Sequence, residues 1–158
     1  MTGPLQDKFV QDDLILGQAR NIIYSCCLGC FEVELPIVMF HLTNPKPSVE
    51  EIKEYFTLQD QIFSQCNTPF VFVADTSPIK SMFNSEIRTL MSNSIVEIEQ
   101  KHGKKMLGVF LIAKNQLTKL LIKLVNYLNP PIVPQTICAS RQMALTEAQA
   151  ILESNLVV

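Results

Sequence analysis

Apolar and polar residues alternate along the chain in two different patterns, and the change from one pattern to the other marks the predicted elements. Consecutive apolar residues at 70–74 (FVFVA) and 106–113 (MLGVFLIA) are typical of strands that are covered on both faces of a parallel sheet. Apolar residues recur every three or four positions at 49–65, 84–101 and 115–128, which predicts amphipathic helices. Strands therefore alternate with helices, which indicates crossover connections and a mainly parallel sheet.

The ends of these helices carry recognisable polar signals. Ser48 with Glu51 fits a capping box, in which each residue satisfies a free backbone N–H group of the other. Thr146 with Gln149 fits a second box, which predicts that a last helix begins near residue 146. Gly103 is expected to end the second helix.

The N-terminal part of the chain is less regular. Residues 21–26 and 31–42 are interpreted as extended, with Pro36 as a break or an edge position, and residues 135–139 as a short strand. We expect one α/β domain over residues 1–158, with a core from about 20 to 153. Its mainly parallel sheet would have four to five strands, an N-terminal antiparallel strand and about four flanking helices.

The helix predicted at 115–128 combines leucines with lysines. The residues expected to face inward are Leu117, Leu120, Leu121, Leu124, Val125 and Leu128. Lys119, Lys123 and Asn126 are expected to face solvent. A helix of this composition also fits a membrane surface, but the sequence favours a helix that packs on the core.

Composition excludes several classes of protein. Apolar residues make up 47% and charged residues 18% of the chain, which excludes a disordered chain and favours an apolar pocket or a surface for homodimerisation. The formal net charge of -2 gives no general attraction for nucleic acid. No apolar run approaches the roughly 20 residues of a membrane span, and the N-terminus lacks the layout of a secretory signal.

The five cysteines are an odd number, which indicates free thiols and a cytoplasmic protein. Cys26, Cys27 and Cys30 lie close together, but a structural zinc site needs a second pair that the sequence does not offer. We interpret them as packing residues, with redox chemistry or lipid attachment as the alternatives. The sequence has no nucleophile or phosphate-loop motif. We therefore predict no enzyme activity, no catalytic residue, no metal and no cofactor.

A polar turn follows the strand predicted at 70–74. Asp75 ends that strand, and Ser85 lies in the first turn of the next helix, where free N–H groups favour an anion. Each residue has a simple structural role and a functional alternative. Asp75 accepts hydrogen bonds from the turn or binds a ligand, and Ser85 or Asn84 caps the helix or Ser85 is a regulated site.

Residues 75–87 resemble the signature of STAS domains, the fold of the anti-sigma-factor antagonists. The positions that match in type and register are Asp75, Ser77, Ile79, Met82, Ser85 and Ile87. Residues 36–153 are similar in element order to a divergent SpoIIAA-like branch of that family. Phe83 and Glu86 depart from the signature, which has an aspartate and a glycine at these positions.

The resemblance implies a non-catalytic signalling domain that docks a protein partner, such as a regulatory kinase or an anti-sigma-like protein. It places a phosphorylation site at Ser85, although Glu86 would repel a phosphate there. The docking residues that we predict are Asp75, Thr76, Ser77, Ser81, Asn84, Ser85, Glu86 and Arg88. The fold is shared in outline with lipid-binding Sec14-like domains. The alternative function is thus binding of a lipid or another apolar ligand in a groove between the sheet and the helices at 84–101 and 115–129.

Overall fold

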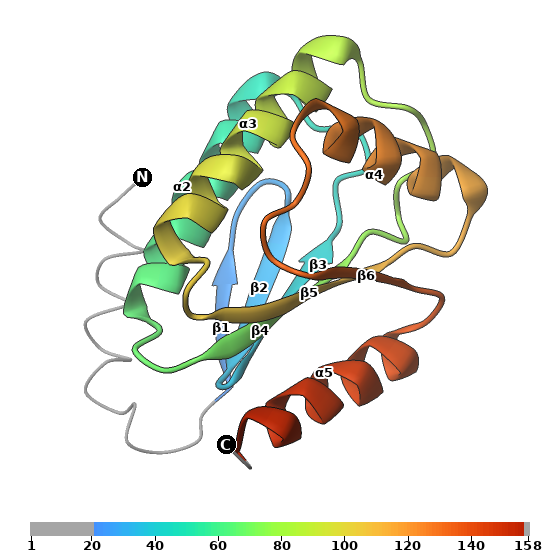
Figure 1. The fold of residues 1–158 in the computed structure, drawn as a ribbon. Helices are drawn as coiled ribbons and strands as arrows, with labels where there is room; N and C mark the ends of the chain where they lie inside the picture. Colours follow the sequence, from blue (N-terminus) through green and yellow to red (C-terminus); the bar gives the residue numbers. More distant parts are fainter. Residues whose placement is uncertain (1–20, 157–158) are drawn as a thin grey trace.

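A six-stranded sheet whose strands lie side by side in chain order organises the protein (Figure 1). The computed structural model describes residues 21–156. The strands are β1 (Ile22–Ser25), β2 (Gly29–Glu34), β3 (Ile37–Leu42), β4 (Phe70–Asp75), β5 (Met106–Ile112) and β6 (Gln135–Cys138). The helices are α2 (Val49–Gln65), α3 (Ser85–His102), α4 (Gln116–Leu128) and α5 (Arg141–Leu156). Within residues 21–156, this arrangement confirms the predicted α/β class and the expectation of about four helices.

The sheet is antiparallel at its N-terminal side and parallel elsewhere. β1 and β2 form a hairpin, β2 and β3 are antiparallel, and β3 through β6 run parallel. The predicted extended run at 31–42 is divided between β2 and β3 at the turn that contains Pro36, as expected for a residue without an N–H group. The sheet has six strands because the N-terminal region contributes a hairpin where the prediction had a single antiparallel strand.

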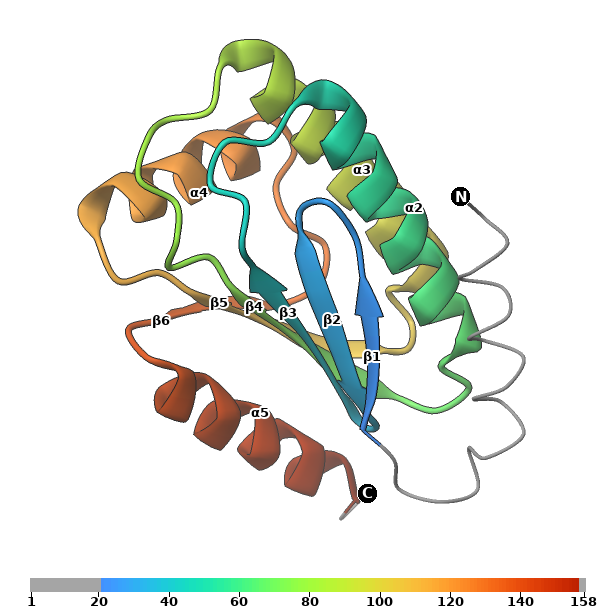
Figure 2. The ribbon, with the colours of Figure 1, turned by 180° about the vertical axis from the view of Figure 1, so that it is seen from behind.

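Three helices cover one face of the sheet and one helix covers the other. Because the strands follow one another in space and parallel crossovers are right-handed, α2, α3 and α4 must lie on the same face. Figures 1 and 2 show α5 alone on the opposite face. The two faces carry two separate apolar clusters, one with Phe72 and Ala74, the other with Val71 and Val73. Coverage on both sides explains why β4 is apolar at five consecutive positions.

α5 begins earlier than predicted. It starts at Arg141, and the N–H group of Met143 donates a hydrogen bond of 3.2 Å to the Ser140 hydroxyl. Thr146 lies inside the helix, so the predicted capping box there was wrong. Ala144 and Ala148 are fully buried against the sheet, and a Cβ atom added at Gly108 would be 3.4 Å from Ile151. Small residues on both elements thus let α5 lie close to β5.

The other helix starts are confirmed. The N–H group of Glu51 donates to the Ser48 hydroxyl at 3.2 Å, and the N–H group of Ser48 donates to the Glu51 carboxylate at 2.9 Å. Asn84 accepts a hydrogen bond of 2.9 Å from the N–H group of Ile87, and Asn115 caps α4 in the same way. These bonds satisfy backbone donors that a helix leaves free at its N-terminus.

The orientation of α4 differs from the prediction. Leu121 and Val125 are buried as expected, but Leu120, Leu124 and Leu128 are exposed. Apolar side chains occupy more than half of the circumference of this helix, so periodicity alone did not determine which side packs inward. The buried side is the one that carries Thr118, Leu121, Ile122 and Val125.

Candidate functional site

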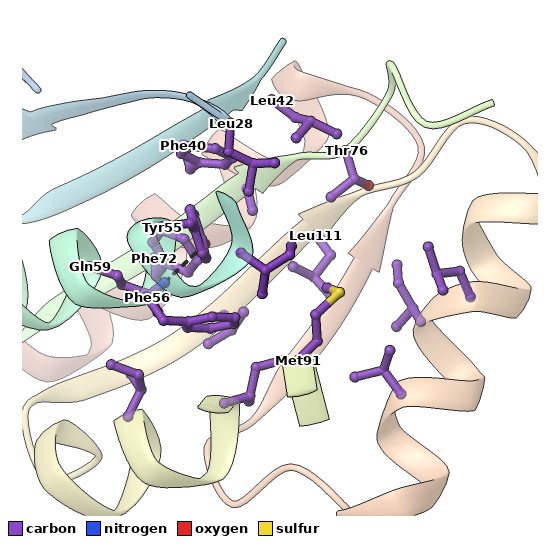
Figure 3. A pocket seen from close by; sticks show the side chains of 18 of the residues that line it. Leu28, Phe40, Leu42, Tyr55, Phe56, Gln59, Phe72, Thr76, Met91 and Leu111 are labelled. Atoms are coloured by element: carbon purple, nitrogen blue, oxygen red, sulfur yellow. Dashed lines mark hydrogen bonds between the residues drawn. The ribbon is translucent and has the colours of Figure 1, made fainter. Parts of the chain in front are cut away.

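An apolar pocket of about 150 Å³ lies between the sheet and the three helices that cover its first face (Figure 3). Its floor is formed by side chains of β3, β4, β5 and β6, and its walls come from α2, α3 and α4. Labelled side chains from the floor include Phe40, Phe72 and Leu111, and those from the walls include Tyr55 and Met91. The strands and helices that flank the pocket are thus those whose apolar patterns are strongest in the sequence.

The pocket extends from the surface to an inner strand. β5 lies between β4 and β6, yet the side chain of Leu111 is only partly buried. Met91 and Ile95 of α3, which also line the pocket, are partly exposed as well. An apolar side chain on an interior strand is normally covered by the helix layer. The gap between the layers therefore leaves apolar surface accessible where a packed core would cover it.

Two polar side chains of α2 lie in this apolar lining. The side-chain amide of Gln59 donates a hydrogen bond of 3.1 Å to the hydroxyl of Tyr55, as Figure 3 shows. Burial raises the pKa of Tyr55 far above its ordinary value, so its hydroxyl stays neutral at physiological pH. A neutral hydroxyl and an amide can hydrogen-bond a hydroxyl or carbonyl group of a ligand.

Polar groups at the α4 side of the pocket are paired within the protein. The Asn126 side chain donates a hydrogen bond of 2.7 Å to that of Gln135, which joins α4 to β6. The carboxylate of Glu99 accepts hydrogen bonds of 3.1 Å from the N–H groups of Ile132 and Val133. None of the described residues that line the pocket is a lysine, an arginine or a histidine. The lining therefore offers no cation to a charged ligand.

The turn that the sequence singled out lies beside this pocket. Asp75 accepts a hydrogen bond of 3.0 Å from the N–H group of Ser77 and a second bond from the Ser77 hydroxyl. The Thr76 hydroxyl donates to the carbonyl of Ile112 at 2.6 Å. The Arg88 guanidinium donates to the carbonyl of Phe83 at 2.5 Å. Asp75, Thr76, Arg88 and the capping Asn84 thus hold the turn and the start of α3 in place.

The remaining predicted docking residues differ in their exposure. Ser85 and Glu86 are exposed at the start of α3, next to the exposed Asn84, and Ser81 is partly exposed. The structure brings all eight predicted residues to one turn and the start of the helix that follows it.

The inner side of this turn contributes two apolar residues to the pocket that were not among the predicted site residues. Ile79 and Phe83 are buried and line the pocket. Phe83 departs from the STAS signature, and its apolar character is the feature of the sequence that could have indicated a buried position. The same turn therefore carries polar groups on its surface and apolar groups on its inner side.

The cysteines show no sign of a metal or redox site in the part of the chain that the structure describes. No group of three potential ligands that could hold a metal ion occurs among residues 21–156. A hydrogen bond with the Glu54 carboxylate raises the pKa of the exposed Cys27 thiol, and burial raises that of Cys26. A raised pKa keeps both thiols protonated, which opposes a role as nucleophiles.

Both histidines pair with carboxylates away from the pocket lining. His41 lies 3.0 Å from Glu32, and the buried His102 lies 2.7 Å from Asp60. Burial alone would raise the pKa of Asp60, but hydrogen bonds from His102 and Lys101 outweigh it and leave that pKa below its usual value. His102 of α3 thus connects this helix to α2.

No protein family model matches the sequence, and no curated protein is similar to it in sequence. Among solved structures, the fold is similar to an uncharacterised protein of the DUF3478 family from Shewanella loihica PV-4, which has a SpoIIAA-like fold. The two chains are 15% identical with a TM-score of 0.49, and the match covers 82% of this chain and 92% of the other. That protein has the fold to which the resemblance at residues 75–87 points. No residue role or activity follows from this similarity.

Proposed function

We propose that the protein binds a small, uncharged apolar ligand in the pocket between the sheet and α2, α3 and α4. The observation that carries this proposal is the apolar cavity of about 150 Å³ above the inner strand β5. Protein interiors are normally packed with few voids larger than a water molecule, so an apolar space of this size that no side chain fills is suited to an apolar ligand.

The volume of the pocket limits the size of the ligand. A cavity of about 150 Å³ lined by leucine, isoleucine and phenylalanine is large enough for benzene. The enclosed part therefore fits one aromatic ring or a short segment of an alkyl chain. A longer molecule would extend through the gap that exposes Leu111.

The charge of the lining limits its chemistry. Transfer of an unpaired charge from water into an apolar site costs several kcal/mol of free energy. Among the described residues, no cation lines the pocket to offset that cost. The bound part of the ligand is therefore neutral. A single hydroxyl or carbonyl group is compatible with Tyr55 and Gln59, the polar pair that α2 contributes to the lining.

The proposal is tested with a neutral fluorescent apolar probe, N-phenyl-1-naphthylamine, whose phenyl ring would occupy the enclosed part of the pocket while the naphthyl group extends through the gap that exposes Leu111. We expect the probe to bind the full chain saturably. We also expect the unfolding temperature of the protein to rise when the probe is present. At a free probe concentration of 100 times Kd, binding adds about 2.7 kcal/mol to the free energy of unfolding. For a domain of this size that corresponds to about 5–10 °C. Fluorescence that rises linearly without saturation, together with an unchanged unfolding temperature, would contradict the proposal.

A second function, docking of a protein partner, is favoured by the exposure of Ser85 and Glu86 at the start of α3. Ser85 is the first residue of the helix, and its neighbour Asn84 already supplies the cap. The Ser85 hydroxyl is thus not needed as the cap. A negative group at this position interacts favourably with the helix dipole, so a phosphate could be added there without unfolding α3.

The docking proposal is tested by affinity capture from an extract of the source cells with the wild type and the Ser85→Asp variant. We expect the variant to capture at least about tenfold less of a specific partner, because the new charge lies on the docking surface. Ser154→Asp, on the exposed side of α5, is the charge-matched control and should behave as the wild type. Equal recovery of the same proteins by all three forms would contradict a regulated docking site at Ser85.

A further inference from the structure

The outward side of α4 carries a row of exposed apolar side chains. Leu120, Leu124 and Leu128 follow one another at intervals of four residues and are 48%, 36% and 49% exposed. Tyr127 lies on the same side of the helix and is 85% exposed, and Ile132, shortly after the helix, is 61% exposed. Single exposed apolar residues are ordinary, but a row of them along one helix face marks an interaction surface. We call these five residues the α4 apolar surface.

The charge around this helix is of one sign in the sequence. Between Glu99 and Glu147 the chain contains no aspartate or glutamate, although its overall formal charge is -2. The basic residues in this interval are Lys101, Lys104, Lys105, Lys114, Lys119, Lys123 and Arg141. Lys101 and Arg141 pair with Asp60 and Glu32 at 3.0 Å and 3.9 Å, so the charge available to a partner near α4 comes from the other lysines. Lys119 and Lys123 lie on α4 and Lys114 just before it, and Lys114 and Lys123 are exposed. The segment that presents the α4 apolar surface therefore favours a partner that is apolar and negatively charged.

We propose that the α4 apolar surface docks on a lipid bilayer that contains anionic lipids. The leucines would enter the boundary between head groups and acyl chains, where an amphipathic helix gains the free energy of apolar burial. The amphipathic ring of Tyr127 suits the level of the head groups. Lys114, Lys119 and Lys123 would remain in water near the anionic head groups, where each contributes about a fivefold increase in binding.

A second copy of the chain fits this surface less well. A two-fold dimer places the same surface of each protomer against the other. Lys119 and Lys123 of both copies would then crowd around one apolar contact, and α4 carries no acidic residue to pair with them. Like charges brought together at an interface oppose association. An anionic bilayer has no such conflict.

The choice of a bilayer rather than an acidic protein rests on the function proposed above. An apolar ligand of the pocket is far more soluble in a membrane than in water. Leu121, Ile122 and Val125, on the inward side of α4, line the pocket, whereas the α4 apolar surface is on the outward side. One helix therefore separates the proposed ligand from the proposed membrane. Within residues 21–156, no helix combines the length and the apolar composition that crossing a membrane requires, so the contact would be at the surface.

The test is flotation of the full chain with two kinds of vesicle, phosphatidylcholine alone and phosphatidylcholine with 30% phosphatidylserine. We expect the protein to float with the second kind and to remain in the dense fractions with the first. Binding should decrease as the salt concentration rises, because the lysine contribution is screened. A protein that floats with neither vesicle, or equally with both, would overturn the proposal.

Two pairs of variants separate the apolar and the electrostatic contributions. The double variant Lys119→Glu/Lys123→Glu should weaken binding to the anionic vesicles at least about thirtyfold. The charge-matched control is the double variant Lys53→Glu/Lys104→Glu, at two exposed lysines outside α4, and it should have a much smaller effect. Leu120→Ser should weaken binding about fivefold. Met143→Ser, on α5, is its control because Met143 is also 48% exposed. Equal loss with the α4 variants and their controls would assign the binding to overall charge and overturn the proposal.

The same samples distinguish this proposal from its alternatives and from the pocket proposal. If light scattering shows a dimer that Leu120→Ser dissociates, the α4 apolar surface is a contact between copies and the membrane proposal fails. N-phenyl-1-naphthylamine binding is measured without vesicles, so vesicle docking can fail while the pocket binds the probe. Conversely, flotation without probe binding would retain the membrane surface and contradict the proposed ligand.

Discussion

Replacement of Leu111 by tryptophan is expected to abolish binding of N-phenyl-1-naphthylamine while the protein stays folded. The Leu111 side chain points from β5 into the pocket (Figure 3). It is only partly buried. An indole at this position would occupy the space that the probe needs. Because no other side chain fills this space, the larger side chain should cost less than the about 1–3 kcal/mol typical of overpacking in a filled core. We expect the probe affinity to fall at least about a hundredfold, measured by fluorescence titration.

The matched control is Leu107→Trp on the same strand. Leu107 is also partly buried, but it packs with the apolar cluster on the α5 side of the sheet. This variant should bind the probe with the affinity of the wild type, because it leaves the pocket unchanged. Undiminished binding by folded Leu111→Trp would show that the probe binds elsewhere. An equal loss in both variants would show that the effect is not specific to the pocket.

Replacement of Phe31 by alanine is expected to lower the free energy of unfolding by about 3–5 kcal/mol, the largest effect on stability that we predict. Phe31 of β2 is 0% exposed. Its ring centroid lies 4.7 Å from that of Phe40, 5.3 Å from that of Tyr55 and 6.3 Å from that of Phe72. Truncation would leave a cavity among aromatic rings that cannot collapse into it. The unfolding temperature should fall by about 6–20 °C.

Urea unfolding is the measurement for this prediction, with the midpoint reduced and the dependence on urea unchanged. Phe31→Leu keeps most of the apolar volume and should lose only about 1–2 kcal/mol, so it remains measurable if the alanine variant does not fold. A loss below about 1 kcal/mol in the alanine variant would show that the β1–β2 hairpin does not share the core with α2. The hairpin would then not belong to the cooperative unit that holds the pocket.

The pocket and the polar turn are parts of one structure, which links the two proposed functions physically. Ile79 and Phe83 line the pocket, while Ser85 and Glu86 are exposed at the start of α3 immediately after them. A ligand that contacts Phe83 therefore reaches the backbone that positions Ser85. Arg88 also holds the carbonyl of Phe83. Any partner that discriminates between the empty and the filled pocket would find the difference at this turn.

Local patterns in the sequence determined most of the framework. Five apolar residues in succession at 70–74 need a protein environment on both faces, and that requirement alone indicated the interior strand β4. Ser48 and Asn115 identified the starts of α2 and α4 because capping depends on residues three positions apart. The alternation of such strands and helices then allowed the α/β class to be predicted.

The same reasoning failed where a choice depended on neighbours distant in sequence. Thr146 with Gln149 fits a capping box, but α5 starts at Arg141, and Ala144 and Ala148 in its first turns pack on the sheet near Gly108 of β5. Contacts across the sheet therefore outweighed a local signal. Tertiary packing, which no sequence period contains, determined where this helix begins.

The sequence by itself determined the alternation of strands and helices after residue 48, the apolar strand β4 and the polar turn after it, because those features arise from residues close together in the chain. The tertiary structure alone decided that Phe83 faces a pocket and that Leu120, Leu124 and Leu128 face solvent. Both depend on where the helices pack on the sheet and on which side of α4 faces inward, which is set by side chains on different elements. An apolar residue in a sequence thus indicates that burial is favourable, and only the packed structure shows which surfaces remain available to a ligand or a membrane.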